Sequence, residues 1–94
     1  MPLMAFAWDA AKSARNVAAR GLPFELAILM FDGPTLETLD ARRAYGEARI
    51  RAIGRIGDRV LACVYTDRGE TRRIISLRYA SRKERDAYRQ AFPE

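Results

Sequence analysis

One segment, residues 72–85, constrains the fold of this 94-residue chain more than any other. It opens with a run rich in isoleucine and leucine, which is typical of a buried strand. Ser81 and Glu84 then have the S-x-x-E spacing of a capping box, in which side chains bind free N–H groups at the start of a helix. The segment therefore predicts a strand over Arg72–Tyr79 that leads directly into a helix over Ser81–Phe92.

The rest of the chain predicts two more helices and further strands. Asp9 and Gly21 should bracket a helix over Ala10–Arg20, because aspartate is a good N-cap and glycine suits the left-handed position after a helix. Pro23 fits the first turn of a second helix. The remaining expected elements are a strand over Met4–Trp8, a helix over Phe24–Phe31, and strands over Thr35–Leu39, Glu47–Arg55 and Arg59–Thr66.

Short turns between the later strands indicate antiparallel pairing. We predict a single domain, residues 1–94, of the α+β class. It should contain a small antiparallel sheet of about four strands, packed by two N-terminal helices and one C-terminal helix.

Strand alternation predicts an arginine-rich face on this sheet. In the last strand, one side should carry Arg72, Ile74, Ser76 and Arg78, and the other should carry Ile75, Leu77 and Tyr79. Arg49 and Arg51 alternate with apolar residues in the same way. If the two arginine sets share a face, the sheet has an arginine-lined concavity.

Positive charge gathers around the junction between the last strand and the last helix. The chain has 17 Lys and Arg residues against 12 Asp and Glu residues, which gives a net charge of +5 and a pI near 10.0. Small basic proteins suit nucleic acids or acidic proteins, and phosphate backbones are the usual partner of a dense basic cluster. A solvated surface with no ligand is less favoured, because the positive charges cluster instead of alternating with acids.

The chain has one cysteine and no histidine. Cys63 lies within an apolar run, so we expect a buried, unreactive thiol. Without histidine the usual zinc ligands and the usual general base are missing, and we expect no metal and no cofactor. No signal-peptide pattern opens the sequence and no apolar stretch approaches ~20 residues, so we expect a cytoplasmic protein that does not cross a membrane.

Four blocks of the sequence follow one another in an order and spacing seen in one protein family. The C-terminal block is residues 73–85 followed by Tyr88. The other blocks are Phe6-Ala7-Trp8-Asp9 with Lys12 and Asn16, Tyr45-Gly46-Glu47 with Arg49 and Gly54, and Tyr65-Thr66 with Arg68-Gly69. Together they resemble the BrnT family, the ribonuclease toxins of bacterial type II toxin–antitoxin systems.

The resemblance implies a compact RelE-like fold and an endoribonuclease that inhibits translation and growth. It also implies a BrnA-like antitoxin with a ribbon-helix-helix DNA-binding part. Two toxin and two antitoxin chains are expected to assemble, and the antitoxin is expected to make most of the contacts with promoter DNA.

Cleavage of RNA by its own 2′-hydroxyl needs no metal, but it needs groups that align the hydroxyl and stabilise the crowded phosphate. Arg78 is the first candidate for binding that phosphate, because an arginine fork donates two parallel hydrogen bonds. Its alternative role is an ion pair with Glu47 or Glu84. Glu47 is the candidate base, or else an acid that orients an arginine. Tyr65 is a candidate for stacking or proton donation, or else a core residue.

Further basic residues are candidates for RNA binding: Lys12, Arg49, Arg72, Arg82 and Lys83. Lys12, Asn16 and Arg20 share one face of the first helix, because they are spaced at i, i+4 and i+8. Arg20 stands where many BrnT-like sequences have a histidine before the glycine. It is included among the catalytic candidates, although arginine cannot act as a base near neutral pH.

This substitution leaves a second function open. A catalytically silent BrnT-like module that binds antitoxin or nucleic acid, and acts as a co-repressor, would need the basic face but no base. Loss of growth arrest in an Arg78→Ala variant would favour the ribonuclease over this alternative.

Overall fold

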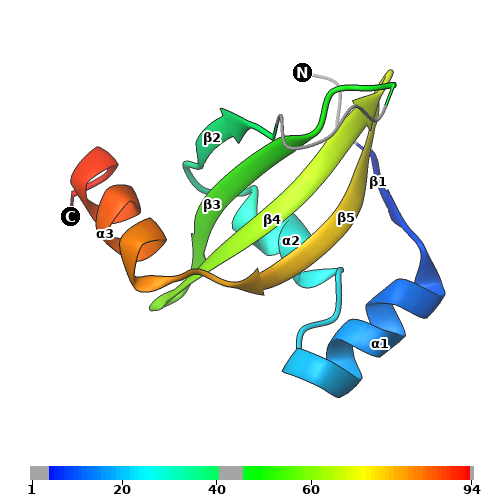
Figure 1. The fold of residues 1–94 in the computed structure, drawn as a ribbon, viewed down its shortest axis with the longest axis horizontal. Helices are drawn as coiled ribbons and strands as arrows, with labels where there is room; N and C mark the ends of the chain where they lie inside the picture. The colour runs from blue at the N-terminus through cyan, green and yellow to red at the C-terminus, as the bar shows by residue number, and fades with distance from the viewer. Residues whose placement is uncertain (1–4, 41–45, 94) are drawn as a thin grey trace.

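The structure is a computed structural model that describes residues 5–40 and 46–93. These residues form one five-stranded sheet and three helices (Figure 1). In chain order the elements are β1 (Ala5–Trp8), α1 (Ala10–Arg20), α2 (Leu26–Met30), β2 (Leu36–Leu39), β3 (Ile50–Ile56), β4 (Arg59–Arg68), β5 (Thr71–Tyr79) and α3 (Arg82–Ala91). The predicted α+β class and the helix order are confirmed. Met4, in the expected first strand, and Tyr45, in the second block of the resemblance, lie outside the described residues.

The sheet has the strand order β1-β5-β4-β3-β2. Strands β2 to β5 form an antiparallel meander, as their short turns predict. The expectation of about four strands, all antiparallel, is wrong: β1 is a fifth strand and pairs parallel with β5, with Phe6 opposite Arg72 and Trp8 opposite Ile74. Two helices and three strands separate β1 from β5 in the chain, so no turn between them reveals their pairing.

The first helix begins and ends where the sequence predicts. The Asp9 carboxylate accepts a hydrogen bond from the Lys12 N–H at 3.0 Å, and Gly21 ends α1 with a φ of 71°. Helix α2 is shorter than the predicted Phe24–Phe31. The N–H groups of Leu26 and Ala27 bind carbonyls three residues back instead of four, so residues before Leu26 form turns instead of α-helix.

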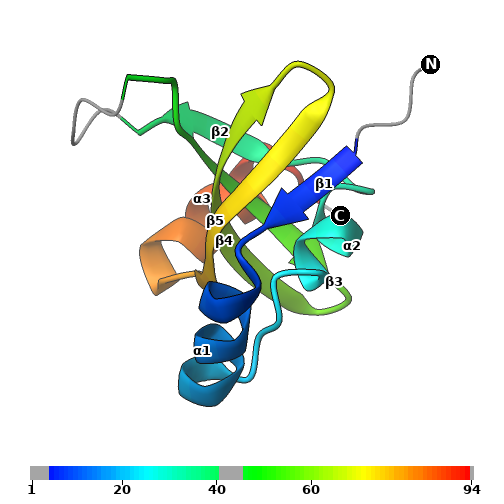
Figure 2. The same cartoon turned by 90° about the vertical axis from the view of Figure 1, so that its right-hand side faces the viewer.

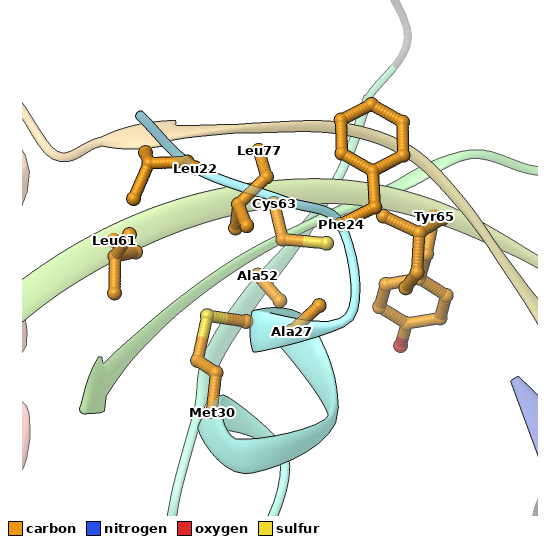
Figure 3. Packing of buried hydrophobic residues seen from close by; sticks show 10 residues of the cluster. Leu22, Phe24, Ala27, Met30, Ala52, Leu61, Cys63, Tyr65 and Leu77 are labelled. Atoms are coloured by element: carbon orange, nitrogen blue, oxygen red, sulfur yellow. The ribbon is translucent and has the colours of Figure 1, made fainter. Parts of the chain in front are cut away.

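Helices α2 and α3 lie on opposite sides of the sheet, and α1 lies near its β1–β5 edge (Figure 2). The larger core cluster is on the α2 side, where Ala27 and Met30 pack against β3, β4 and β5 (Figure 3). Its buried members are Leu22, Phe24, Ala27, Met30, Ala52, Leu61, Cys63, Tyr65, Ile74 and Leu77. Cys63 is therefore a core residue, as expected, and burial raises the pKa of its thiol to about 12.

The α3 side has a smaller core at one end of the sheet. Its buried members are Ile53, Val60, Ala62, Ala80 and Tyr88. The predicted capping box is present, since Ser81 Oγ accepts from the Glu84 N–H and a Glu84 oxygen accepts from the Ser81 N–H. Tyr88 and Phe92 pack against this cluster, as their helical spacing predicts.

A bulge in β5 changes which side chains share a face. Val64 pairs with Ser76, but the next residue of β4, Tyr65, pairs with Ile74, so Ile75 is an extra residue in β5. Ile74 therefore joins Leu77 in the α2-side core. The prediction that Arg72 and Ile74 share a face with Arg78 is wrong, because strict alternation does not anticipate the inserted residue.

No helix among the described residues has the length and apolarity needed to cross a bilayer.

Candidate functional site

Arginines gather on the α3 side of the sheet. We call this set the arginine face, and its members are Arg49, Arg51, Arg73 and Arg78. Arg51 lies opposite Val64, which lies opposite Ser76 on β5. The two β5 arginines lie on either side of Ser76, opposite Thr66 and Ala62. Arg49 directly precedes β3. Because the side chain of the next residue, Ile50, packs on the α2 side, strand alternation places Arg49 on the α3 side. The predicted arginine-lined surface is thus present, with Arg73 in the place expected for Arg72.

Helix α3 covers only one end of this side of the sheet. In Figure 1 the side of the sheet opposite α2 is toward the viewer, with α2 behind the strands and α3 to the left. The apolar contacts of α3 reach Ile53, Val60 and Ala62, and its smaller cluster does not include Val64 or Ser76. On the α3 side, none of the described helices packs over the middle of β4 and β5, so this part of the sheet is accessible from that side.

Arg78 is held by Glu84 in a two-bond ion pair. Its Nη1 and Nη2 donate to Oε1 and Oε2 of Glu84 at 2.7 and 2.9 Å. Arg51 Nη1 lies 3.7 Å from Glu84 Oε2, so one carboxylate contacts two arginines of the face. The hydrogen bonds from Arg78, with a smaller contribution from Ser81, lower the pKa of Glu84 to about 2. The alternative role for Arg78, an ion pair with Glu84, is therefore what the structure shows.

Glu47 is paired with Arg68. Nε and Nη2 of Arg68 donate to the two carboxylate oxygens at 3.1 and 2.8 Å. These bonds lower the pKa of Glu47, and the nearby charges of Arg49 and Arg73 act in the same direction. A carboxylate stabilised in its ionised form is a weak base, so neither Glu47 nor Glu84 has the raised pKa that suits a proton acceptor near pH 7.

Tyr65 and Arg72 lie on the α2 side, away from the arginine face. Tyr65 is 3% exposed, its hydroxyl donates to Glu37 Oε1 at 2.7 Å, and burial raises its pKa. The Arg72 guanidinium stacks over the Tyr65 ring at 3.9 Å and over the Phe31 ring at 4.7 Å. It also donates two hydrogen bonds to Asp67, at 2.9 and 3.0 Å. These contacts are those of a structural cluster, which agrees with the alternative placement of Tyr65 in the core.

The predicted residues of α1 lie at the edge of β5. Lys12 and Arg20 are exposed, and they line a groove of about 300 Å³. Asn16, on the same helix face, has a structural role: its Nδ2 donates to the carbonyls of Leu22 and Leu77 at 2.8 and 2.9 Å. Arg20 is the last residue of α1 and is not part of the arginine face.

The first turn of α3 places two more cations next to this face. Arg82 and Lys83 are exposed and directly follow the helix N-cap, Ser81. Cations at a helix N-terminus oppose the helix dipole, so an outside anion would relieve the conflict.

Two arginines of this face, Arg51 and Arg73, are not among the site residues predicted from the sequence. Arg51 had a visible signal, its alternation with Arg49, but it was not selected as a site residue. Arg73 was missed because the bulge reverses the side on which it projects. Glu84 is both the predicted cap and one of the two ion-pair partners that the sequence analysis gives for Arg78. Among the described residues no group of three or more Cys, Asp or Glu side chains is placed to hold a metal ion.

One comparison with known proteins identifies a family for this chain. The family model described as the ribonuclease toxin BrnT of type II toxin–antitoxin systems matches residues 8–84. A search of curated proteins found no match. The matched region extends from the end of β1 through the whole sheet to the first turn of α3, and it contains all four arginines of the face. Because the match covers most of the 94 residues, the chain belongs to the BrnT family of ribonuclease toxins of type II toxin–antitoxin systems.

Proposed function

We propose that this chain is an endoribonuclease toxin that cleaves RNA on the arginine face by metal-independent transesterification. The observation that carries the proposal is the convergence of four arginines, from β3, from the residue before it and from β5, on one side of the sheet. Guanidinium groups donate several hydrogen bonds in fixed directions and remain charged at all ordinary pH values, so they suit a phosphate whose charge increases during the reaction.

In this reaction the 2′-oxygen of one nucleotide attacks the adjacent phosphorus. A bond from phosphorus to O2′ forms and the bond to O5′ breaks, which leaves a 2′,3′-cyclic phosphate and a free 5′-hydroxyl. Glu47 and Glu84 have lowered pKa values, which makes them weak bases. In this proposal water therefore accepts the 2′ proton and supplies a proton to O5′. The chain contributes by positioning the phosphate and by stabilising the negative charge of the transition state.

Glu84 acts in this proposal as a positioning residue. Its two hydrogen bonds fix the plane of the Arg78 guanidinium, and its capping bonds tie that geometry to the start of α3. A guanidinium that is already oriented loses less side-chain entropy when it binds a phosphate. Arg51, close to the same carboxylate, is oriented together with Arg78.

The family supports a protein antitoxin as the partner of this chain. We further propose a RelE-like arrangement in a single domain, a BrnA-like ribbon-helix-helix antitoxin, and an assembly of two chains of each kind. In that assembly the antitoxin would make most of the promoter contacts. The free toxin would inhibit translation and growth by cleaving RNA in the cytoplasm.

The test is incubation of the purified, antitoxin-free chain with total RNA in excess EDTA. We expect fragments that end in 2′,3′-cyclic phosphate from the native chain, and strongly reduced cleavage by Arg78→Ala. Arg59→Ala is the matched control: it removes the same charge from the turn end of the sheet, where Arg59 donates to the Tyr79 hydroxyl. Arg78→Lys retains a charge without the fork, and thermal unfolding of each variant shows whether the fold is kept.

A second function is favoured by one observation. Both carboxylates near the arginine face are ion-paired, which leaves neither with the raised pKa of a base. The resemblance to the family also implies a histidine at the position of Arg20 in many members. If RNA stays intact while the folded chain still binds its antitoxin, the chain is a silent co-repressor, and Arg20→His becomes the first substitution to test for restored cleavage.

A further inference from the structure

A basic groove runs between α1 and the edge of β5. It encloses about 300 Å³, and its charged lining residues are Lys12, Arg15 and Arg20, with no acidic side chain among the lining residues. Ile75 and Ser76 of β5 form its opposite wall. Asp9, outside the lining, interacts electrostatically with Lys12 and Arg15, but three cations on a concave surface still outnumber this one carboxylate and attract polyanions.

The walls of this groove are fixed by hydrogen bonds. Asn16 donates to the Leu77 carbonyl on β5, which ties the middle of α1 to the strand. Ser13, one turn earlier, accepts from the Phe24 N–H at 2.9 Å and is buried. Strand β1 ends at Trp8, opposite Ile74, so the edge of β5 beyond that point is occupied by α1 instead of a strand. The groove therefore exists before any ligand binds.

Ser76 connects the groove to the arginine face. It lines the groove, and it also lies in the cross-strand row with Val64 and Arg51. Along β5 it stands between Arg73 and Arg78. Ser76 can contribute to both regions because of the bulge: the unpaired Ile75 lines the groove at the strand edge, and Ser76 next to it pairs with Val64 on the α3 side.

We propose that this groove binds the phosphates of single-stranded RNA next to the nucleotide held on the arginine face. The inference rests on the proposed function and adds a second contact region and a substrate class to it. A strand that leaves the arginine face past Ser76 enters the groove directly, where Lys12, Arg15 and Arg20 meet its backbone.

Single-stranded RNA fits this groove better than a duplex. The 2′-oxygen must rotate into line with the leaving oxygen, which an unstacked nucleotide can do and a regular A-form helix resists. The groove offers charge and a short apolar wall, which suits a flexible backbone with its bases turned outward.

The test measures binding instead of cleavage, so it does not depend on catalysis. The probes are 2′-O-methyl RNA oligonucleotides of about 4 and about 16 nucleotides, the range of ordinary single-strand site sizes, which cannot react because the 2′-oxygen is blocked. The variant is Lys12→Gln/Arg15→Gln/Arg20→Gln. The control, Arg55→Gln/Arg59→Gln/Arg89→Gln, removes the same charge from exposed positions that do not line the groove.

We expect the native chain and the control to bind the longer probe more tightly than the shorter one. The groove variant should lose that gain, with an affinity for the longer probe reduced on the order of tenfold at low salt. A plot of log K against log salt concentration should also be less steep for this variant, by about 2 in slope, because each of three lost phosphate contacts contributes about 0.7 on a single strand.

Three results would overturn the inference. One is a length-dependent gain that the groove variant retains. Another is equally tight binding of the longer probe after it is annealed to its complement. The third is lost antitoxin binding with unchanged RNA affinity, which would assign the groove to a protein partner. None of these results bears on the EDTA cleavage assay, so the two proposals fail separately.

Discussion

The ion pair between Arg78 and Glu84 allows a stability prediction whose size follows from the structure. Glu84→Gln keeps the length of the side chain and an oxygen that accepts from the Ser81 N–H, but it removes the charge opposite Arg78. The Glu84 side chain is 12% exposed, and the Arg78 side chain is 39% exposed. The variant therefore isolates the charge from the capping interaction.

The expected loss of unfolding free energy follows from the shift in the Glu84 pKa. A fall from the ordinary value of 4.5 to about 2 corresponds to about 3 kcal/mol at about 1.4 kcal/mol for each pH unit. Because Arg78 is partly exposed, solvent screening reduces this to about 2 kcal/mol at pH 7. The folded-state pKa is the lower one, so the contribution is complete above about pH 4.5 and is lost as the pH falls toward 2.

Urea unfolding at pH 7 and at pH 3 measures this contribution. At pH 3 roughly 40% of the difference between native and variant chains should remain. Glu70→Gln is the control, since this exposed glutamate lies in the β4–β5 turn and its variant should stay within about 0.5 kcal/mol of the native chain. A loss that is the same at both pH values, or below about 0.5 kcal/mol at pH 7, would show that the ion pair is not the origin of the shift.

Three further predictions concern the scaffold. Gly54→Ala should lower the free energy of unfolding, measured with heat or urea, by about 1–3 kcal/mol, because the new methyl group would overlap the Met30 side chain. Gly33→Ala is the control: its methyl group would meet no atom within 4 Å, so the variant should be nearly as stable as the native chain. Arg72→Met should lower the free energy of unfolding by about 2 kcal/mol, because it removes the stacking on Tyr65 and the ion pair with Asp67. Arg73→Met should mainly weaken RNA binding. Equal losses of stability would contradict the placement of the two arginines on opposite faces. Cys63 should resist alkylation in the folded chain and react once urea unfolds it, as measured by mass spectrometry. Rapid labelling without urea would contradict its burial.

Local signals in the sequence predict much of the fold. The Asp9 cap, the Gly21 end of α1 and the Ser81–Glu84 capping box are all present, because each depends on atoms within a few residues. The parallel pairing of β1 with β5 depends on a long-range contact that no local pattern specifies. The start of α2 lies later than the sequence predicts, because the sequence does not distinguish a tight turn from the first turn of a helix.

The candidate site was predicted in part for the same reason. Arg78, Arg49 and the concentration of arginines on one face follow from composition and alternation. The Arg78–Glu84 ion pair, one of the two roles predicted for Arg78, is local in the chain, whereas the exchange of Arg72 for Arg73 depends on the register between β4 and β5. Tyr65 illustrates the limit, since its residue type permits a role in catalysis but its position opposite Ile74 buries it in the core.

The extra residue in β5 changes which positions, even-numbered or odd-numbered, face the α2 side. Before Ile75 the even-numbered positions, Arg72 and Ile74, point toward the α2 side, and after it the odd-numbered Leu77 does. A deep mutational scan of the strand should therefore show tolerance that alternates with period two and changes parity once, at Ile75. A deletion of Ile75 should remove the bulge and leave one regular alternation, with Arg72 still on the α2 side and Arg73 still on the α3 side. Arg72 therefore stabilises the scaffold on one side of the sheet, and the inserted residue places its neighbour Arg73 on the same face as Arg78.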